Sequence, residues 1–152
     1  MVGFLTGCTD SRLHGRKYRR FILPGLIDNI LHGKYRFGKR SFGYLTGMLG
    51  GVLRGELTHT DLDIYPAHLH INVDAGRRGN RLGQRLMEAY LQQLRDLEVK
   101  GVHLNTTSLN EAACRLYEKM GFRLLEARPD RFWAKWFGRP VENRSYGLVF
   151  FD

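Results

Sequence analysis

The chain has 152 residues, of which 43% are hydrophobic and 12% aromatic. This is the usual size of one folded domain with enough apolar side chains for a core, which excludes a mainly disordered chain and two full domains. No apolar run reaches the roughly 18 residues of a membrane-spanning helix, and the first residues lack the layout of a signal peptide. Two cysteines, Cys8 and Cys114, are too few for a disulfide framework or a four-thiolate zinc site. We therefore expect a cytoplasmic protein without a membrane partner.

The net charge of +9 is concentrated in the N-terminal part, whose first 60 residues hold 10 basic and 3 acidic side chains. Such a balance favours a polyanionic partner, although a solvated basic face would have the same composition. One hypothesis is nucleic-acid binding through residues 12–40, where Tyr18, Phe21, Tyr35 and Phe37 interleave with basic residues. No stacking motif of a known RNA-binding module is visible, so we rank nucleic acid last among the partners.

The N-terminal third predicts one strand and two helices. The strand covers residues 2–8, and the first helix covers 23–31, with Pro24 in its first turn and Gly33 after its end. The second helical pattern covers 42–53. Within and just after it a glycine recurs every four residues, at Gly43, Gly47, Gly51 and Gly55. Because glycine destabilises a helix by about 1 kcal/mol per position, this stripe predicts close packing against another helix, for example across a dimer.

The pattern becomes regular from residue 65 onward. Apolar and polar residues alternate over 69–73, which predicts a strand, and an amphipathic helix follows over 82–97. The remaining predicted elements are a strand over 102–106, a helix over 112–120 opened by a capping box of Ser108 and Glu111, and closing strands over 122–125 and 145–150. Strand–helix–strand order implies parallel neighbouring strands. The predicted fold class is α/β (α+β), with a mixed central sheet and flanking helices.

The turn over residues 77–83 carries the most chemical information. It lies between a predicted strand and a predicted helix, where backbone N–H groups lack partners within the helix and the helix dipole is positive. Two glycines permit close backbone approach, and four arginines surround the helix start: Arg77, Arg78, Arg81 and Arg85. The turn therefore predicts a pyrophosphate site, although a basic turn that stood alone could equally be an exposed surface loop. The residues match neither a Walker phosphate loop nor the dinucleotide fingerprint.

Residues 73–83 resemble the acyl-CoA pyrophosphate loop of the GNAT superfamily of N-acyltransferases. Arg78 takes the first place of that family's pattern and Gly83 the last, while Arg81 stands where the family usually has glycine. Residues 110–122 resemble the second family signature, Asn-x-x-Ala-x-x-x-Tyr-x-x-x-Gly-Phe, and follow at the right distance. The resemblance implies acetyl-CoA as co-substrate, no metal, and these cofactor-binding residues: Val73, Arg78, Gly79, Asn80, Arg81, Leu82, Gly83, Asn110 and Ala113.

Two catalytic residues are predicted. The resemblance implies that Tyr117 is the acid that assists the leaving thiolate, and that a backbone N–H near Val73 stabilises the oxyanion. Taken alone, Tyr117 could also be an ordinary core aromatic. His70 is the candidate base, with His68, His103 and Asp74 as alternatives. A metal site at the two strand histidines is set aside, because no third ligand stands at a useful spacing.

Within the superfamily, residues 65–71 and the tail 139–143 look most like small bacterial members related to the acetyltransferase-like domain of some O-GlcNAcases, which can bind without catalysing. We interpret 1–152 as a single domain, with a helical basic insertion over 11–60 and an acetyl-CoA-binding core over 65–150. The first strand and helices of the family fold have no counterpart, and the sheet edge left uncovered predicts a homodimer. The leading hypothesis is an acetyl-CoA-dependent N-acetyltransferase that acts on a primary amine of a small molecule or protein. An inactive CoA-binding or protein-interaction module is the alternative.

Overall fold

The computed structural model describes residues 2–35, 38–74, 76 and 81–151. Its centre is a five-stranded sheet with the strand order β1-β2-β3-β5-β4. The strands are β1 (Gly3–Cys8), β2 (Ala67–Val73), β3 (Gly101–Thr107), β4 (Arg123–Pro129) and β5 (Glu142–Val149). Only the central pair, β2 and β3, is parallel among the described strand pairs, and the others are antiparallel. The predicted mixed sheet with flanking helices is confirmed.

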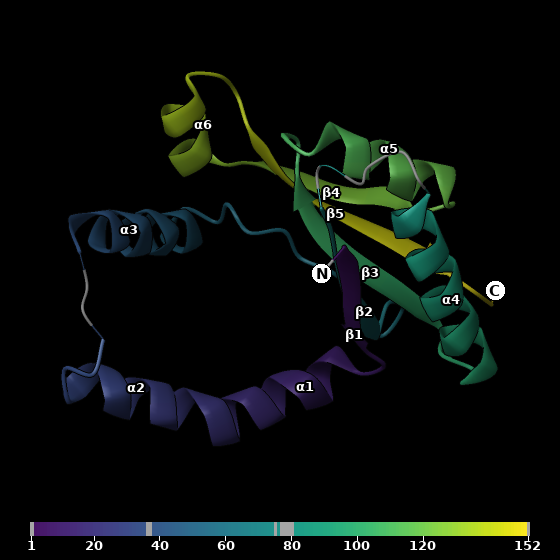
Figure 1. Cartoon of the computed structure of the whole chain (residues 1–152), viewed down its shortest axis with the longest axis horizontal. Helices are drawn as coiled ribbons and strands as arrows, with labels where there is room; N and C mark the ends of the chain where they lie inside the picture. The colour runs from purple at the N-terminus through teal and green to yellow at the C-terminus, as the bar shows by residue number, and fades with distance from the viewer. Residues whose placement is uncertain (1, 36–37, 75, 77–80, 152) are drawn as a thin grey trace.

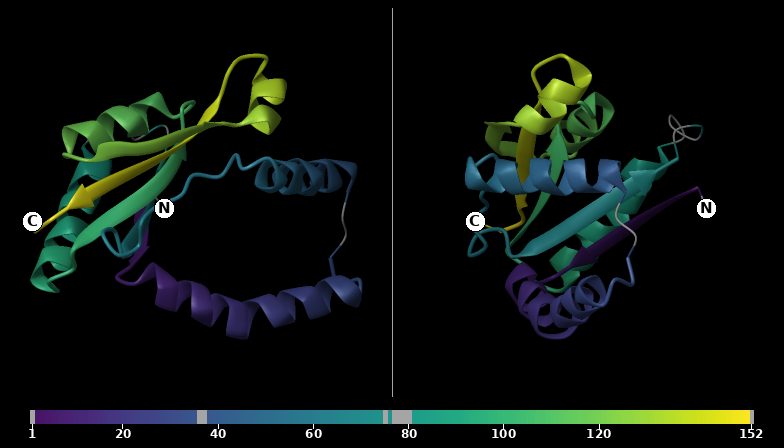
Figure 2. Two further views of the ribbon diagram at one scale, coloured as in Figure 1. Left: turned by 180° about the vertical axis from the view of Figure 1, so that it is seen from behind. Right: turned by 90° about the vertical axis from the view of Figure 1, so that its left-hand side faces the viewer.

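The helices lie on both sides of this sheet. They are α1 (Ser11–Lys17), the π-helical turn η1 (Tyr18–Ile22), α2 (Leu23–Leu31), α3 (Lys39–Leu53), α4 (Leu82–Asp96), α5 (Glu111–Lys119) and α6 (Arg131–Phe137). Helices α4 and α5 cover one face, while α3 and α6 lie beyond the other (Figures 1 and 2). The α1, η1 and α2 segments join into one curved rod below α3 (Figure 1). The sheet therefore separates the two motif-bearing helices from the helices of the N-terminal part.

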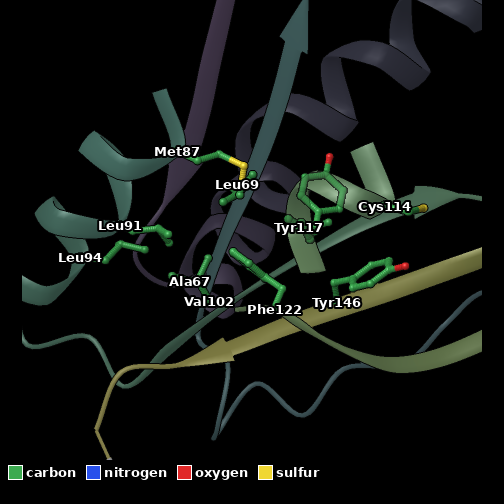
Figure 3. Close-up of a cluster of buried hydrophobic side chains, with 11 residues drawn as sticks. Ala67, Leu69, Met87, Leu91, Leu94, Val102, Cys114, Tyr117, Phe122 and Tyr146 are labelled. Carbon is green, nitrogen blue, oxygen red and sulfur yellow. The ribbon is translucent and has the colours of Figure 1, made fainter. Parts of the chain in front are cut away.

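The hydrophobic core fills the space between the sheet and the α4–α5 layer. Side chains from β2, β3 and β5 meet apolar side chains of both helices there (Figure 3). The buried members are Ala67, Leu69, Met87, Leu91, Leu94, Val102, Leu104, Cys114, Tyr117, Phe122 and Tyr146. Met87, Leu91 and Leu94 lie three or four residues apart, so one stripe of α4 faces the sheet, as its amphipathic pattern predicts.

The opposite face of the sheet is held by polar contacts. The segment from Arg54 to Pro66 crosses it, and the hydroxyl of Thr60 lies 2.8 Å from that of Ser145 on β5. The side-chain amide of Asn143 donates to the backbone oxygen of Glu56 at 3.2 Å and to the carboxylate of Asp130 at 3.0 Å. Asp130 also accepts a hydrogen bond from the backbone N–H of Trp133 at 2.9 Å, which caps α6. This network fixes α6 relative to the sheet.

The glycine stripe of α3 packs closely within the chain. A Cβ atom at Gly47 would collide with the ring of Phe132 on α6, so only glycine permits this approach. The aromatic ring of Tyr44 contacts the ring of Phe132 at a centroid distance of 5.8 Å. At Gly47 the helix that the stripe meets is therefore α6 of the same chain. The homodimer stays a prediction.

Two local predictions need correction. The helix predicted to be opened by Ser108 begins instead at Glu111, with Asn110 as its N-cap. The Ser108 hydroxyl accepts a hydrogen bond from the backbone N–H of Glu142 at 3.0 Å, and this contact with β5 takes it away from the helix end. Helix α6 was not predicted, although its aromatic residues Phe132, Trp133, Trp136 and Phe137 recur at helical spacing and so lie on one side of the helix.

Candidate functional site

The parallel ladder between β2 and β3 ends soon after it begins. Its pairs are Ala67 with Val102 and His68 with His103, although β2 continues to Val73 and β3 to Thr107. On its other side β2 is paired with β1 along its length, from His68 to Val73. Within the described ladder, the β3-facing edge of β2 beyond His68 therefore has no strand partner. Its backbone N–H and C=O groups are available to hydrogen-bond a ligand.

A cavity of about 220 Å³ lies where the two strands diverge. Residues of β2, of the start of α4 and of α5 line it. The predicted site residues among them are Val73, Arg81, Leu82, Gly83, Asn110, Ala113 and Tyr117. The structure thus brings together seven residues from two motifs that lie about 30 positions apart in the sequence. We call this space the splay cavity.

The N-terminus of α4 opens into the splay cavity. The first three amides of the helix, those of Leu82, Gly83 and Gln84, precede any carbonyl that could bind them within the helix. Arg81 is the N-cap and has φ 54° and ψ 15°, the left-handed conformation that glycine adopts most readily. This conformation explains why the family motif that this loop resembles usually has glycine at the position of Arg81. The predicted contacts of Arg78, Gly79 and Asn80 lie outside the described residues.

Gly83 joins the three walls of the cavity. A Cβ atom there would lie 3.4 Å from Leu116 of α5, 3.6 Å from Val73 and 3.8 Å from Ile71 of β2. These are ordinary van der Waals distances, so alanine fits but a larger side chain would fill the cavity. The absence of a side chain at Gly83 keeps the space between α4, β2 and α5 open.

Tyr117 lies at the inner wall of the splay cavity. Its ring contacts the rings of Phe122 and Tyr146 at centroid distances of 6.2 and 5.7 Å. The phenol oxygen points away from both (Figure 3). Burial, together with the nearby thiol of Cys114, raises the pKa of Tyr117 to about 12. The side chain is therefore both a core aromatic and a neutral hydrogen-bond donor at the cavity.

Asn110 and Ala113 lie where β3 leads into α5. The backbone oxygen of Asn110 accepts hydrogen bonds from the N–H groups of Ala113 and Cys114, both at 3.0 Å, while its own N–H binds Thr107. The Asn110 side chain makes no capping hydrogen bond to its helix. The side-chain amide of Asn110, which lines the cavity, is therefore free to hydrogen-bond there instead of capping the helix.

His70 lies on β2 but not in the lining of the splay cavity. Side chains alternate along a strand, so Ile71 faces the cavity while the exposed His70 shares the opposite face with His68. The rings of His68 and His103 lie 5.1 Å apart, and burial, helped by the charges of neighbouring histidines, lowers the pKa of His68 to about 4. The backbone oxygen of Tyr65 lies 2.9 Å from His103 Nδ1. The predicted acid and base candidates thus lie on opposite faces of the sheet.

The other predicted features add little to this site. Among the described residues, no group of three or more histidine, cysteine or acidic side chains could hold a metal ion. Asp74 accepts a hydrogen bond from the N–H of Gly76 at 2.8 Å, so its carboxylate orders the loop entry. In the part of the chain that the structure describes, no helix is both long and apolar enough to cross a membrane.

Five lining residues were not predicted from the sequence. They are Ile71, Asn72, Gln84, Ala112 and Leu116. Two of them could have been found from periodicity, since Ile71 shares a strand face with Val73, and Leu116 lies three positions after Ala113 on the helix.

Comparisons with known proteins agree with this geometry. Residues 18–122 match the model of the acetyltransferase (GNAT) family. Mycothiol acetyltransferase of Nocardiopsis dassonvillei is 44% identical over 54 residues, which are 36% of this chain and 16% of that protein. The crystal structure of SsHAT superposes with a TM-score of 0.66 at 26% identity, and covers 97% of this chain and 66% of its own.

A third similarity concerns the fold alone. The structure of yncA from Salmonella typhimurium with its cofactor acetyl-CoA superposes with a TM-score of 0.51 at 21% identity, over 64% of this chain and 56% of that one. The present chain therefore spans about a sixth of the curated relative and about two thirds of SsHAT.

Proposed function

Because this chain belongs to the acetyltransferase (GNAT) family, we propose that it transfers an acetyl group from acetyl-CoA to a primary amine of a small molecule or protein. One observation carries the proposal. Seven residues of the two family motifs line a single cavity at the point where the parallel strands diverge. The curated relative supports the same reaction class, since it is a mycothiol acetyltransferase.

The residues at the splay cavity fit acetyl-CoA. The free amides of Leu82 and Gly83 at the positive end of α4, with the Arg81 guanidinium, suit the pyrophosphate. The unpaired edge of β2 offers backbone hydrogen bonds to the amide groups of the pantetheine arm. We infer that the thioester lies between Val73 and Tyr117, the two predicted residues that flank the inner cavity.

In the reaction, the neutral amine attacks the thioester carbonyl, a C–N bond forms and the C–S bond breaks. The backbone N–H near Val73 stabilises the oxyanion that develops on the carbonyl oxygen. The ammonium proton goes to His70, whose exposed position on the other sheet face leaves it open to an acceptor arriving from that side.

Tyr117 acts on the leaving thiolate. An ordinary thiol has a pKa of about 8.5, whereas the pKa of Tyr117 is about 12. Complete proton transfer from the phenol is therefore uphill, and we infer that Tyr117 stabilises the thiolate mainly by donating a hydrogen bond. The thiol proton then comes from solvent.

The test combines CoA binding with turnover. CoA at 100 times its Kd stabilises a protein by about 2.7 kcal/mol, which a thermal shift detects. Thiol release from acetyl-CoA is measured in parallel with a panel of primary amines. Gly83→Leu, which fills the splay cavity, should lose both signals, whereas Gly15→Leu, placed in open space on α1, should keep them.

The outcomes separate the alternatives. A thermal shift without thiol release for any amine would favour the inactive binding module. The absence of a shift, together with a salt-sensitive affinity for nucleic acid, would favour binding through residues 12–40. The division into an 11–60 insertion and a 65–150 core, the homodimer and the cytoplasmic location stay predictions.

A further inference from the structure

We propose that the cavity between α3 and α6 binds a planar aromatic ring carried by the amine acceptor. This inference rests on the proposed N-acetyltransferase function. It identifies a chemical class of acceptor, an amine that bears an aromatic ring. The site is separate from the splay cavity and shares no lining residue with it.

The cavity is large and its walls are aromatic. Its volume is about 870 Å³, within the usual range of small-molecule sites. Four rings from the two helices line it, together with the bare backbone of Gly43 and Gly47: those of Tyr44, Phe132, Trp133 and Trp136. The rings contact one another edge-on or tilted, at centroid distances between 5.1 and 6.5 Å. We call these four side chains and two glycines the aromatic cavity.

Helix α6 is fixed at its start, and yet the aromatic cavity is exposed. Asp130 caps α6, and Glu56 accepts a hydrogen bond from the N–H of Arg131 at 3.3 Å, so the helix is tied to the sheet at its start. Nevertheless Trp136 is 69% exposed. A large aromatic side chain that is held in place without being buried is typical of a binding site rather than of a core.

The charge of the lining determines which part of the acceptor enters. Lys135 is the one charged side chain among the described lining residues. Ring faces can attract an ammonium group, but the neighbouring lysine repels it, whereas ring faces and edges attract an uncharged aromatic ring without that repulsion. The ring therefore enters the cavity, and the amine stays outside it.

The position of α6 suits an acceptor site. β3 ends at Thr107, which pairs with Asn143 of β5. The preceding residue, Glu142, is the first of β5 and pairs with Pro129 of β4, just before α6. Helix α6 thus lies at the end of the sheet where β2 and β3 diverge. It lies on the side away from α4 and α5 (Figure 1). By strand alternation, the predicted base His70 also faces away from the splay cavity and its helices.

The experiment uses the chain's own fluorescence, because its two tryptophans, Trp133 and Trp136, are both in the aromatic cavity. The full chain is titrated with 2-phenylethylamine and with 2-cyclohexylethylamine, a probe of similar size without a π system. We expect the aromatic probe to change the tryptophan emission and to bind about 2- to 10-fold more tightly than the saturated one. The same ratio should appear in the kcat/KM for thiol release from acetyl-CoA.

Two variants and a control sharpen the test. Gly43→Leu fills the cavity from a position with open space around its Cβ, so it should abolish the emission change without damaging the fold. Trp136→Ala should weaken the aromatic probe at least about 5-fold. Phe42→Ala removes a side chain of similar exposure on α3 that does not line the cavity, and should change neither affinity nor rate.

Several results would overturn the inference. Equal affinity for the two probes would remove the role of the aromatic ring. Thiol release with simple alkyl amines but no emission change with the aromatic probe would reject this cavity and leave the proposed function intact. Probe binding without transfer to any amine would reject the acceptor role and the proposed function together. Binding of aromatic-rich peptides alone would reject the small-amine class.

Discussion

The imidazole rings of His68 and His103 lie 5.1 Å apart, side by side on the last described pair of the parallel ladder between β2 and β3. Beyond this pair the strands diverge and the splay cavity begins. His103 is buried and His68 is partly buried, and burial disfavours the charged form of both imidazoles by lowering their pKa. The junction on which the site is built is therefore sensitive to acid.

We predict that the fold loses stability as the pH falls from about 6.5 to about 4. The pKa of His68 is about 4 in the folded chain, against an ordinary 6.5, so in this window the unfolded chain binds a proton that the folded chain does not. Burial lowers the pKa of His103 in the same direction. Urea unfolding at several pH values should show a loss of about 1–3 kcal/mol.

A variant isolates the histidine. His68→Phe keeps an aromatic ring beside His103 but cannot take a proton, so its stability should fall less steeply over the same pH range. His32→Phe is the comparison at an exposed position on the end of α2: it removes an imidazole that lies 3.1 Å from the carboxylate of Asp28, and because such exposed pairs contribute little to stability, its pH curve should stay close to that of the wild type. Parallel pH curves for His68→Phe and the wild type would contradict the assignment.

Much of the fold could be predicted, because local patterns determine it. The period-2 alternation over 69–73 and the helical period over 82–97 describe the faces of β2 and α4 as the structure has them. The divergence of β2 from β3 could not be predicted, because it depends on how the two strands pair. No residue pattern within either strand indicates it. For the same reason the sequence could assign Tyr117 and Val73 to one site only through the family motif. The aromatic cavity depends on the packing of α3 on α6: the glycine stripe predicts a close helix contact, but no local pattern says which helix takes part.

A second prediction concerns the alignment of β1 on β2. The phenol of Tyr90 donates hydrogen bonds toward the backbone oxygens of Cys8 and His68, at 3.1 and 3.2 Å, and it occupies the space where Gly7 has no side chain. Gly7→Ala should destabilise the fold by about 1–3 kcal/mol, because the methyl group collides with the phenol. Chemical unfolding measures this loss.

The control for this prediction lies on the next element of the chain. Gly15→Ala on α1 meets open space and should stabilise the fold by up to about 1 kcal/mol. Combining Gly7→Ala with Tyr90→Ala should cost less than the sum of the two single changes, since the second removes both the phenol oxygen and the ring carbon Cζ that the methyl group meets. Strict additivity would show that the collision is relieved elsewhere.

Tyr117→Phe should separate chemistry from folding. The ring stays packed against Phe122 and Tyr146, so the free energy of unfolding at neutral pH should change by less than about 1 kcal/mol. The loss of the hydrogen bond to the thiolate should lower kcat for thiol release by about 10²-fold with little change in KM. An unchanged kcat would remove Tyr117 from the reaction.

The pKa of Tyr117 adds a pH dependence at the alkaline end. Because that pKa is about 12 in the folded chain and 10 in the unfolded one, the stability that the tyrosine contributes is complete below pH 10 and is lost between pH 10 and 12. Burial also raises the pKa of Tyr90 and of Tyr146 to about 12. Tyrosinate absorbance during alkaline titration should therefore show these groups ionising late, and one late group fewer in Tyr117→Phe.

The last prediction uses a pair of residues with the same strained backbone. Arg81 and Glu98 both have φ 54°, one at the start of α4 and the other just after its end. Because this left-handed conformation destabilises a side-chain-bearing residue by roughly 1 kcal/mol, Arg81→Gly and Glu98→Gly should each raise the free energy of unfolding by about 0.5–1 kcal/mol.

The two variants should differ in their affinity for CoA. Arg81 lines the splay cavity and Glu98 does not, so only Arg81→Gly removes a cation next to the proposed pyrophosphate site. Titration calorimetry should show CoA affinity reduced about 5- to 10-fold in Arg81→Gly and unchanged in Glu98→Gly. If Arg81→Gly instead bound CoA more tightly, the arginine would be an obstacle in the loop rather than a ligand for the diphosphate. Since both glycines relieve the same strain, a difference in CoA affinity reports the arginine side chain alone.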